Sequence, residues 1–597
     1  MAERQQHVSR RGFLAGLGAA GTLALLRGPT ARAAVAPARE VSTQVAVLGG
    51  GVGGLTVAQE LAERGLQVTV FEPKALGGKA RSIPVPGTGQ GGRADLPGEH
   101  GFRFFPGFYK NTTDTMARIP AGGGSVLDNL VDASQEMFVF SSGQMWLLPS
   151  FDENGLEQGI RSVITGMGLA GRVPPNEIAH LVRKMLVFQT SSDARRVGQW
   201  DAVSWWDFVS AERFSPEYQR TFGNGLTKTL VAAKGTRASA RTIGLMALAF
   251  ITSVLSQSNP LVASQSGYGA ADRLLDAPTN EAWIDPWVAH LRSLGVEVVE
   301  GYAATQLHVE AGRIAGATLT GGLGEQVVVR ADHYVAAMPV EKARVLFDAP
   351  VRAAAPELAG LDALEYDYMN GIQLFLDRIP TQAVHGHVAY LSSPWALTSI
   401  NQGLFWDRDL GARYGNGRVA DVLSVDISDF FTPGILYGKA AVDCTPDEIA
   451  AECWAQVKAG LNSPGDTQLS DGMLVDWFLD PALVFSGGPV VSTEPLLINT
   501  PGALAQRPEA TTSIPNLFLA SDYVRCDVDL ATMEGANEAA RAAANAILDA
   551  SGSSEPHAPI GKLWEAPVFD GAKALDEQLY RSGSPNVLDL VPTELPL

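Results

Sequence analysis

The chain has 597 residues, 46% of them apolar and 18% charged, which indicates about two to four folded units with a large apolar core. Its formal net charge of -19 excludes a broad nucleic-acid interface, because contact with a phosphate backbone needs a basic face. The three cysteines, Cys444, Cys453 and Cys526, form no CxxC pair and no metal-ligand run, so no metal site is predicted.

The first 34 residues are predicted to be an export signal. Residues 9–14 (SRRGFL) contain paired arginines, residues 15–26 form a mild apolar stretch, and residues 31–33 (ARA) give a small-x-small cleavage pattern. These three parts in order predict a twin-arginine signal and a periplasmic or other extracytoplasmic location. The alternative is a disordered basic N-terminus. No later segment has about 18 uninterrupted apolar residues, so no membrane span is predicted.

A strand–turn–helix unit begins the predicted mature chain. Residues 44–48 (QVAVL) predict a buried strand, residues 49–54 (GGGVGG) satisfy GxGxxG, and residues 55–64 have helical spacing of apolar side chains. The glycines allow a tight turn and close approach of a pyrophosphate to the helix N-terminus. A second strand, residues 67–71, ends in Glu72, which can accept hydrogen bonds from ribose hydroxyls. This unit alone predicts a Rossmann-like site for NAD or FAD.

Residues 76–82 (LGGKARS) add a glycine doublet and two basic residues just beyond that acid. With this extension the sequence resembles the flavin amine oxidase and phytoene desaturase superfamily, whose extended motif ends in GGRxxS. Lys79 stands where that family usually has arginine, and lysine lacks the bidentate fork. Arg81 is therefore expected to take more of the pyrophosphate contact. The resemblance implies that the cofactor is FAD.

Two later regions resemble the rest of the flavin site in the same superfamily. Residues 514–522 predict a buried strand ending in Asp522, and residues 531–536 (ATMEGA) open an alanine-rich helix. By resemblance, Asp522 binds the ribityl chain or the pyrophosphate, and the start of the helix approaches the flavin N1–C2=O edge. A helix N-terminus there would stabilise the negative charge of a reduced flavin. The same resemblance implies that the strands predicted over 296–307 bring Ala304 against the adenine.

The residues expected to bind FAD come from all of these segments. They are Gly49, Gly51, Gly53, Gly54, Glu72, Gly78, Lys79, Arg81, Ala304, Asp522, Met533, Glu534 and Ala536. No second strand–GxGxxG–helix unit follows, because residues 321–324 lack the motif and predict a hairpin turn. Oxygen, a quinone or another carrier is therefore expected to reoxidise the flavin.

The predicted fold class is α/β, with a Rossmann-like FAD-binding domain of the glutathione-reductase type and a discontinuous α+β substrate domain. The predicted divisions are 1–34 for the signal, 41–115, 285–345 and 495–550 for the FAD-binding domain, 116–284 and 346–494 for the substrate domain, and 551–597 for a C-terminal tail.

Residues 98–109 (GEHGFRFFPGFY) resemble the segment after the flavin motif in bacterial phytoene desaturase-like and hydroxysqualene dehydroxylase-like proteins. The resemblance places Glu99 and His100 near the isoalloxazine as candidate catalytic residues, with the aromatic residues along an apolar cavity. The alternative is an aromatic core with a structural histidine. Residues 242–251 (TIGLMALAFI) are apolar all round and predict a buried helix, either a core helix or the wall of a lipid tunnel.

These features favour an FAD-dependent oxidoreductase that acts on a large apolar substrate. The expected substrate is an isoprenoid, such as a carotenoid precursor or a hydroxylated squalene, with hydride transfer at flavin N5, and such a substrate is compatible with peripheral membrane association. Two alternatives stay open. One is a flavin amine or amino-acid oxidase, which the absence of a clear aromatic pair in residues 514–536 disfavours. The other is an FAD-dependent isomerase without net redox.

Overall fold

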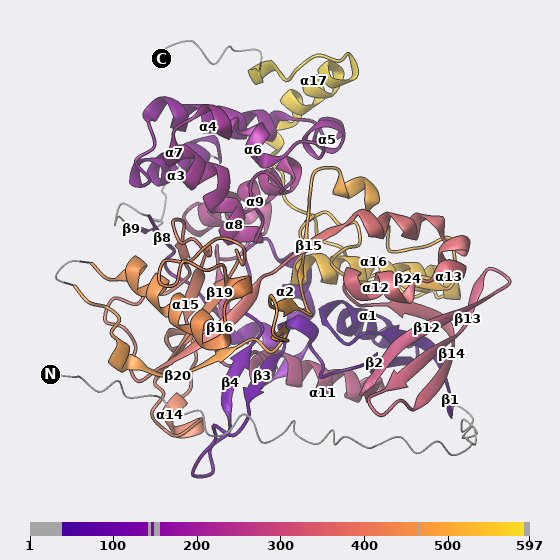
Figure 1. Cartoon of the computed structure of the whole chain (residues 1–597). Helices are drawn as coiled ribbons and strands as arrows, with labels where there is room; N and C mark the ends of the chain where they lie inside the picture. The colour runs from indigo at the N-terminus through magenta and orange to yellow at the C-terminus, as the bar shows by residue number, and fades with distance from the viewer. Residues whose placement is uncertain (1–38, 141–144, 148–155, 464–465, 590–597) are drawn as a thin grey trace.

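The computed structural model describes residues 39–140, 145–147, 156–463 and 466–589, so the predicted signal over 1–34 lies outside the described residues. Two seven-stranded sheets and a group of helices make up the described chain (Figure 1). The first sheet lies to the right in Figure 1, the second to the lower left, and the helices of residues 156–266 above the second sheet.

The first sheet joins three separated parts of the chain. Its strand order is β11-β2-β1-β14-β13-β12, and β24 pairs with β14. The strands are β1 (Arg39–Leu48), β2 (Val68–Glu72), β11 (Glu297–Glu300), β12 (Tyr302–Glu310), β13 (Arg313–Gly321), β14 (Gln326–Ala336) and β24 (Leu517–Leu519). β1 runs parallel to β2 and β14, and β14 runs parallel to β24. The arrangement confirms the predicted Rossmann-like α/β class.

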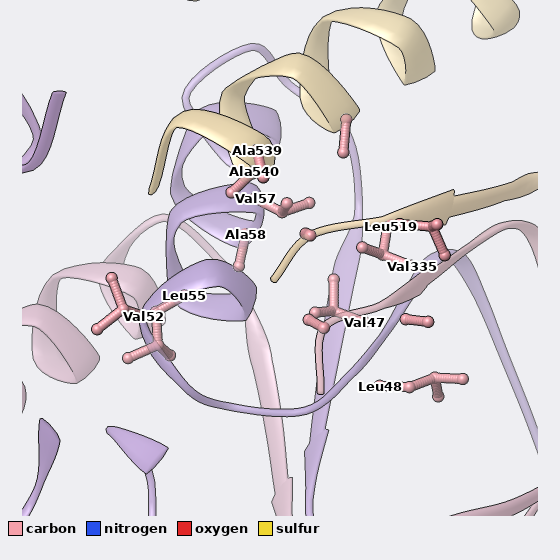
Figure 2. Close-up of a cluster of buried hydrophobic side chains, with 14 of the residues drawn as sticks. Val47, Leu48, Val52, Leu55, Val57, Ala58, Val335, Leu519, Ala539 and Ala540 are labelled. Carbon is pink, nitrogen blue, oxygen red and sulfur yellow. The ribbon is translucent and has the colours of Figure 1, made fainter. Parts of the chain in front are cut away.

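Two helices pack against this sheet at the strands that were predicted to bind the cofactor. α1 (Val52–Ala62) follows β1, and α16 (Met533–Ser551) lies beside it (Figure 2). Figure 2 shows Ala58 of α1 and Ala540 of α16 close together above Val47 of β1. Small side chains let the two helix backbones approach closely, so both helix N-termini reach the same edge of the sheet.

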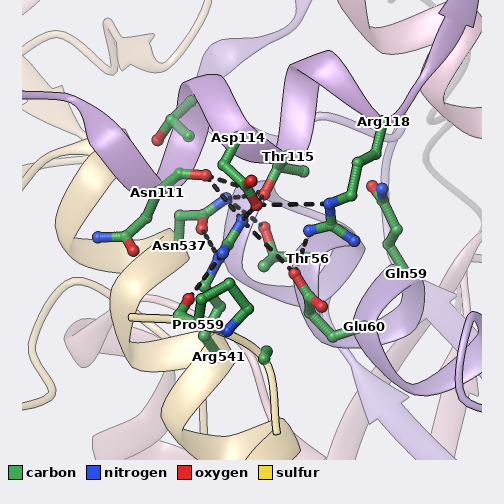
Figure 3. A network of polar contacts seen from close by, with 12 residues as sticks. Thr56, Gln59, Glu60, Asn111, Asp114, Thr115, Arg118, Asn537, Arg541 and Pro559 are labelled. Atoms are coloured by element: carbon green, nitrogen blue, oxygen red, sulfur yellow. Dashed lines mark hydrogen bonds and ion pairs between the residues drawn. The ribbon is translucent and has the colours of Figure 1, made fainter. Parts of the chain in front are cut away.

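A buried polar network joins these two helices to α2 (Lys110–Ala117) (Figure 3). The Arg541 guanidinium of α16, 1% exposed, donates to the Asn111 carbonyl at 2.9 Å and to Asp114 Oδ2 at 2.6 Å. Its Nε donates to Asn537 Oδ1 at 2.9 Å, and its Nη2 lies 3.5 Å from Glu60 Oε1 of α1. Because the cation is buried and fully hydrogen-bonded, it holds the three helices in one arrangement.

The second sheet has two different faces. Its order is β20-β16-β19-β18-β17-β8-β9. The strands are β20 (Leu474–Leu479), β16 (Asn370–Leu376), β19 (Asp421–Ile427), β18 (Thr398–Asn401), β17 (Val388–Tyr390), β8 (Met137–Val139) and β9 (Met145–Leu147). α15 (Pro446–Leu461) packs on one face through Ile449, Cys453 and Val457. The opposite face points to the first sheet and the helices.

The helical group supplies a largely apolar interior. Its longest members are α3 (Leu156–Ala170), α4 (Pro175–Thr190) and α9 (Ala240–Ser258). The helix predicted over 242–251 lies within α9. Among the described residues α9 is the one helix long and apolar enough to cross a membrane, but 72% of its window Ala240–Gln257 is buried inside the protein. α9 therefore has the burial of a core helix.

The C-terminal segment returns to the helical group. α17 (Asp570–Arg581) packs beside α5 (Asp193–Arg195) and α4, and Figure 1 shows it in yellow at the top of the molecule. Arg195 Nε donates to Asp576 Oδ1 at 2.9 Å, and both side chains are 2% exposed. Asp576 Oδ2 also accepts from the Ser192 N–H at 2.8 Å. This buried ion pair fastens the segment after residue 551 to the helices.

Candidate active site

One large cavity of about 930 Å³ lies where the two sheets and the helices meet. At one end it is lined by the glycines after β1 and by the N-terminal turns of α1 and α16. At the other end α3, α4 and α9 line it with apolar side chains. These are Val163, Ile164, Met167, Leu181, Met185, Ile243, Met246, Ala247, Phe250 and Ile251. A single space therefore connects a polar, backbone-lined end to an apolar end.

The motif glycines divide into two kinds. A Cβ on Gly53 would lie 2.3 Å from the carbonyl oxygen of Ala520 after β24, and one on Gly54 would lie 1.9 Å from the carbonyl oxygen of Gly49. These positions need glycine for packing. A Cβ on Gly51 would meet nothing closer than 3.8 Å, so its bare backbone faces the cavity instead. Gly54 itself is not part of the cavity wall.

The polar end fits the phosphates and ribose of a dinucleotide. No N-cap side chain occupies the N-terminus of α1, where Val52 and Gly53 line the cavity, so this helix end can bind an anion. Glu72 lies in the wall and accepts from the N–H groups of Gly50 at 2.7 Å and Lys74 at 2.9 Å. Burial raises the pKa of the Glu72 carboxyl, and these two hydrogen bonds oppose that rise.

The basic residues after the second strand are held by partners that the sequence did not indicate. Lys79 Nζ donates to the carbonyl of Pro495, and Arg81 donates to the carbonyl of Gly78. Arg81 Nη2 also lies 3.6 Å from Glu494 Oε1. Burial alone would raise the pKa of Glu494, but the hydrogen bond from Lys74 and the charge of Arg81 lower it to about 2. Glu494 is therefore an anion at the cavity wall.

Of the five later residues that were predicted to bind FAD, four line the cavity and one does not. Ala304, Asp522, Met533 and Ala536 all line the cavity. Glu534 does not line it, because its side chain lies against α2. Its carboxylate is 1% exposed and accepts from the N–H groups at the start of α2, those of Asn111 at 2.7 Å and Thr112 at 2.8 Å. It caps that helix.

Only one of the two candidate catalytic residues lines the cavity. His100 lines the cavity, and its Nδ1 lies 2.6 Å from Asp480 Oδ2. Glu99 lies outside the cavity wall and accepts from Thr279 N at 3.0 Å and Thr279 Oγ1 at 2.7 Å. Burial raises the pKa of Glu99, although the charge of Arg103 and the hydrogen bonds from Thr279 oppose it. Because Glu99 is held by Ser82 and Thr279 outside the cavity wall, the structure gives it a structural role and leaves His100 as the candidate.

A polar row on the second sheet was not found by sequence reasoning. Asp426 of β19 pairs with Thr398 of β18, and both line the cavity. His387 and Glu136, which directly precede the neighbouring parallel strands β17 and β8, line it as well. Burial raises the pKa of Asp426 to about 7, although the charge of Arg103 opposes that rise.

His387 is held in one orientation. Its Nδ1 contacts Asp272 Oδ2, and its ring lies edge-on to Phe102 and Phe104 at centroid distances of 4.9 and 4.6 Å. The side chains of His387, Thr398 and Asp426 each keep a buried polar atom without a hydrogen-bond partner, namely Nε2, Oγ1 and Oδ1. The cavity wall therefore contains two histidines, of which His387 is held by a hydrogen bond, and several acids. No cluster of metal-ligating side chains is present among the described residues.

Comparison with known families agrees with this arrangement. The chain matches the model for flavin-containing amine oxidoreductases over residues 230–548 and the model for an NAD(P)-binding Rossmann-like domain over residues 47–119. The first match covers more than half of the chain. Together with the uncapped α1 N-terminus and the bare Gly51 backbone, it shows that the cofactor is FAD.

Two curated relatives have names that refer to carotenoid chemistry. Zeta-carotene desaturase of a Synechocystis species is 22% identical over 529 residues, which cover 85% of this chain and 97% of that protein. Carotenoid phi-ring synthase of Chlorobaculum tepidum is 26% identical over 292 residues, which are 46% of this chain. The match spans only 39% of the length of that synthase.

Solved structures of amine oxidases share the fold. Putrescine oxidase bound to putrescine has a TM-score of 0.55 at 14% identity, with 85% of this chain and 100% of that chain covered. Cyclohexylamine oxidase from Brevibacterium oxydans has a TM-score of 0.55 at 13% identity, with 85% of this chain and 99% of that chain covered. At these identities the likeness shows the fold and not the substrate.

Proposed function

Because the chain belongs to the flavin-containing amine oxidoreductase family and is an FAD-dependent oxidoreductase, we propose that its substrate is a large apolar molecule of the isoprenoid class. The apolar end of the cavity, between α3, α4 and α9, carries this proposal. None of the residues of α3, α4 and α9 that line the cavity, from Val163 to Met185 and from Ile243 to Ile251, has a charged side chain. An apolar chain gains free energy by leaving water for such a wall.

When bound, FAD supplies a hydride acceptor or donor at its N5 atom. The chain's own residues would bind the cofactor, orient the substrate and transfer a proton. The N-terminal turn of α1 at Val52 and Gly53 would bind the pyrophosphate, and Glu72 would accept from a ribose hydroxyl. The apolar wall would exclude water and orient the substrate. His100 lines the cavity beside the Asp480 carboxylate and could take or give a proton at its imidazole ring.

An amine substrate is the second candidate, and the acids of the polar row favour it. Asp426 and Glu136 line the cavity and could accept hydrogen bonds from an ammonium group. Burial raises the pKa values of both, in Asp426 to about 7, so the two acids hold less negative charge than exposed carboxylates would. This weakens the attraction for a cation and ranks the amine second.

Anaerobic mixing of the FAD-loaded protein with each substrate class tests the proposal. We expect an isoprenoid alcohol or hydrocarbon to bleach the flavin absorbance or, if the flavin is first reduced, to restore it. Bleaching by diamines or cyclic amines alone, with hydrogen peroxide formed on admitting air, would favour the amine oxidase. Product formed from an isoprenoid without bleaching would favour an isomerase.

We also propose that the chain is exported by the twin-arginine route and associates peripherally with a membrane. The paired arginines Arg10 and Arg11 support the proposed export. Replacing both by lysine should retain the FAD-loaded protein in the cytoplasmic fraction, while the unchanged chain should reach the periplasmic or membrane fraction. An unchanged distribution would overturn the export proposal.

A further inference from the structure

Three polar side chains of the polar row share one face of the second sheet. Thr398 of β18 lies directly opposite Asp426 of β19, so their side chains are neighbours. Ala389 of β17 pairs with Thr398, and His387 lies two residues before Ala389. The ladder extends to His387, whose carbonyl accepts from the Met137 N–H at 2.8 Å. Because side chains alternate along a strand, all three polar side chains meet in the wall of the main cavity.

Each of these three residues has a buried polar atom that meets no hydrogen-bond partner among the described residues. The atoms are Asp426 Oδ1, Thr398 Oγ1 and His387 Nε2. Asp426 and Thr398 are each only 6% exposed. Buried polar atoms in folded proteins are nearly always hydrogen-bonded, so three neighbouring exceptions in one cavity wall need an explanation. A bound molecule that supplies the missing hydrogen bonds would explain all three.

His387 offers a hydrogen-bond acceptor to such a molecule. Its Nδ1 contacts Oδ2 of Asp272, which is 2% exposed, and its ring lies edge-on to Phe102 and Phe104. Because a carboxylate accepts hydrogen bonds, Nδ1 is the donor in this contact. Nε2 of the neutral ring then has a free lone pair and accepts from the ligand.

Asp426 offers a hydrogen-bond donor. Burial raises the pKa of its carboxyl to about 7, although the charge of Arg103 opposes that rise, so a substantial share of it is protonated at neutral pH. A Cβ on Gly101 would lie 2.5 Å from Asp426 Oδ1, so the glycine leaves room for this carboxyl. Gly101 and the candidate catalytic residue His100 both line the cavity. The row therefore begins next to the segment that carries His100.

The acceptor at His387, the donor at Asp426 and the hydroxyl of Thr398 together match an uncharged hydroxyl group. A hydrocarbon would leave all three unpaired, and an ether or a ketone, which only accepts, would leave His387 Nε2 unpaired. A carboxylate or phosphate would meet Glu136 in the same wall and Asp272 behind His387. An ammonium group, which only donates, would leave the proton of the Asp426 carboxyl without an acceptor.

We propose that the polar row binds a hydroxyl group of the apolar substrate and so selects an isoprenoid alcohol over the hydrocarbon of the same skeleton. This deepens the proposed function and rests on it. The apolar ends of α3, α4 and α9 would hold the hydrocarbon part, and Thr398, His387 and Asp426 would determine specificity. A site built to hydrogen-bond a substrate hydroxyl rejects the analogue that lacks it, because the polar groups of the site then stay unpaired.

Equilibrium binding of matched ligands to the FAD-loaded full chain tests the row, with every ligand delivered in the same detergent. The probes are farnesol, its methyl ether, farnesylamine and the hydrocarbon that lacks only the hydroxyl. We expect the Kd for farnesol to be at least about 100-fold lower than that for the hydrocarbon and about 10-fold lower than that for the ether. Equal affinity for farnesol and the hydrocarbon, or tighter binding of farnesylamine than of farnesol, would overturn the proposal.

A variant of the row separates hydrogen bonding from packing. Thr398→Val removes the hydroxyl and nearly keeps the shape, so farnesol should bind about 10-fold more weakly while the hydrocarbon binds equally or more tightly. Ser424→Ala is the matched control, because Ser424 of β19 also has a buried, unpaired hydroxyl but lies outside the cavity wall. It should bind every ligand as the unchanged chain does. Equal weakening of farnesol and hydrocarbon binding in Thr398→Val would assign Thr398 to packing alone and overturn the hydroxyl site.

The same titrations distinguish failure of the row from failure of the proposed function. If the unchanged chain binds farnesol and the hydrocarbon equally, the isoprenoid class stands and only the hydroxyl site is overturned. If the unchanged chain binds neither, the isoprenoid class fails and the hydroxyl site fails with it.

Discussion

Gly53 is a cavity-lining residue at which the packing of the FAD-binding domain leaves no room for a side chain. An added Cβ would lie 2.3 Å from a backbone carbonyl oxygen of Ala520, and a backbone atom cannot rotate away as a side-chain tip can. Gly53→Ala should therefore lose bound FAD and destabilise the fold by about 1–3 kcal/mol. Flavin absorbance per chain and thermal denaturation measure both effects. Gly322→Ala, where a Cβ would meet nothing within 4 Å, is the control and should change neither.

His100 and Glu99 are neighbours in the chain, and the structure predicts different consequences for replacing them. His100→Gln removes a proton-transfer group from the cavity wall and should lower kcat by about 100-fold with FAD retained. Asp480→Asn should also lower kcat, because the Asp480 carboxylate lies 2.6 Å from His100 Nδ1. Glu99→Gln should reduce stability and leave kcat unchanged. The assignment fails if His100→Gln turns over normally.

Asp426 should make stability depend on pH. Its pKa is about 7 in the folded chain against an ordinary value of 3.8, so the folded chain binds the proton more tightly. Stability should therefore fall as pH rises from about 4 to about 7, by at most about 4 kcal/mol. Thermal denaturation across this range should show a flatter dependence for Asp426→Asn. An unchanged slope would mean that the carboxyl is ionised throughout.

At the scale of single elements, α2 depends on an acid from a distant part of the sequence. Glu534 accepts from the first N–H groups of α2, so Glu534→Ala leaves Asn111 N and Thr112 N without their acceptors in a buried place. We expect a loss of about 2–3 kcal/mol, measured by urea unfolding. Glu534→Gln keeps one acceptor oxygen and should lose less. Equal stability of both variants and the unchanged chain would contradict the capping role.

The elements also show what the sequence could predict. α1, β2 and α16 were predicted close to their observed limits, because each combines a strand or helix pattern with glycines or an acid at its end. β1 was predicted to end where it does, but it begins at Arg39 rather than at residue 44. The polar row was not predictable. Asp426, Thr398 and His387 meet only through the register of short strands, and no local pattern encodes that register. The capping role of Glu534 was missed for a related reason, since its partner helix lies more than 400 residues earlier.

At the scale of the whole molecule, the cavity exists only while the helical group stays against the two sheets. The C-terminal segment holds that arrangement, because it runs from α16 past the first sheet to the helices. The Trp564 N–H donates to the Tyr268 hydroxyl at 2.9 Å, and α17 then contributes the buried Asp576–Arg195 pair. Breaking such a pair by removing one partner leaves the other charge buried and uncompensated.

Asp576→Ala should therefore loosen the helical group at a cost of about 3–5 kcal/mol. Hydrogen exchange should rise in α4 and α5 before it rises in β1 and β2, and KM for an apolar substrate should increase while FAD stays bound. Glu577→Ala is the matched control, since its partner Arg581 is exposed and surface pairs contribute little. If exchange rises equally in the first sheet, the segment supports the whole fold rather than the apolar end of the cavity.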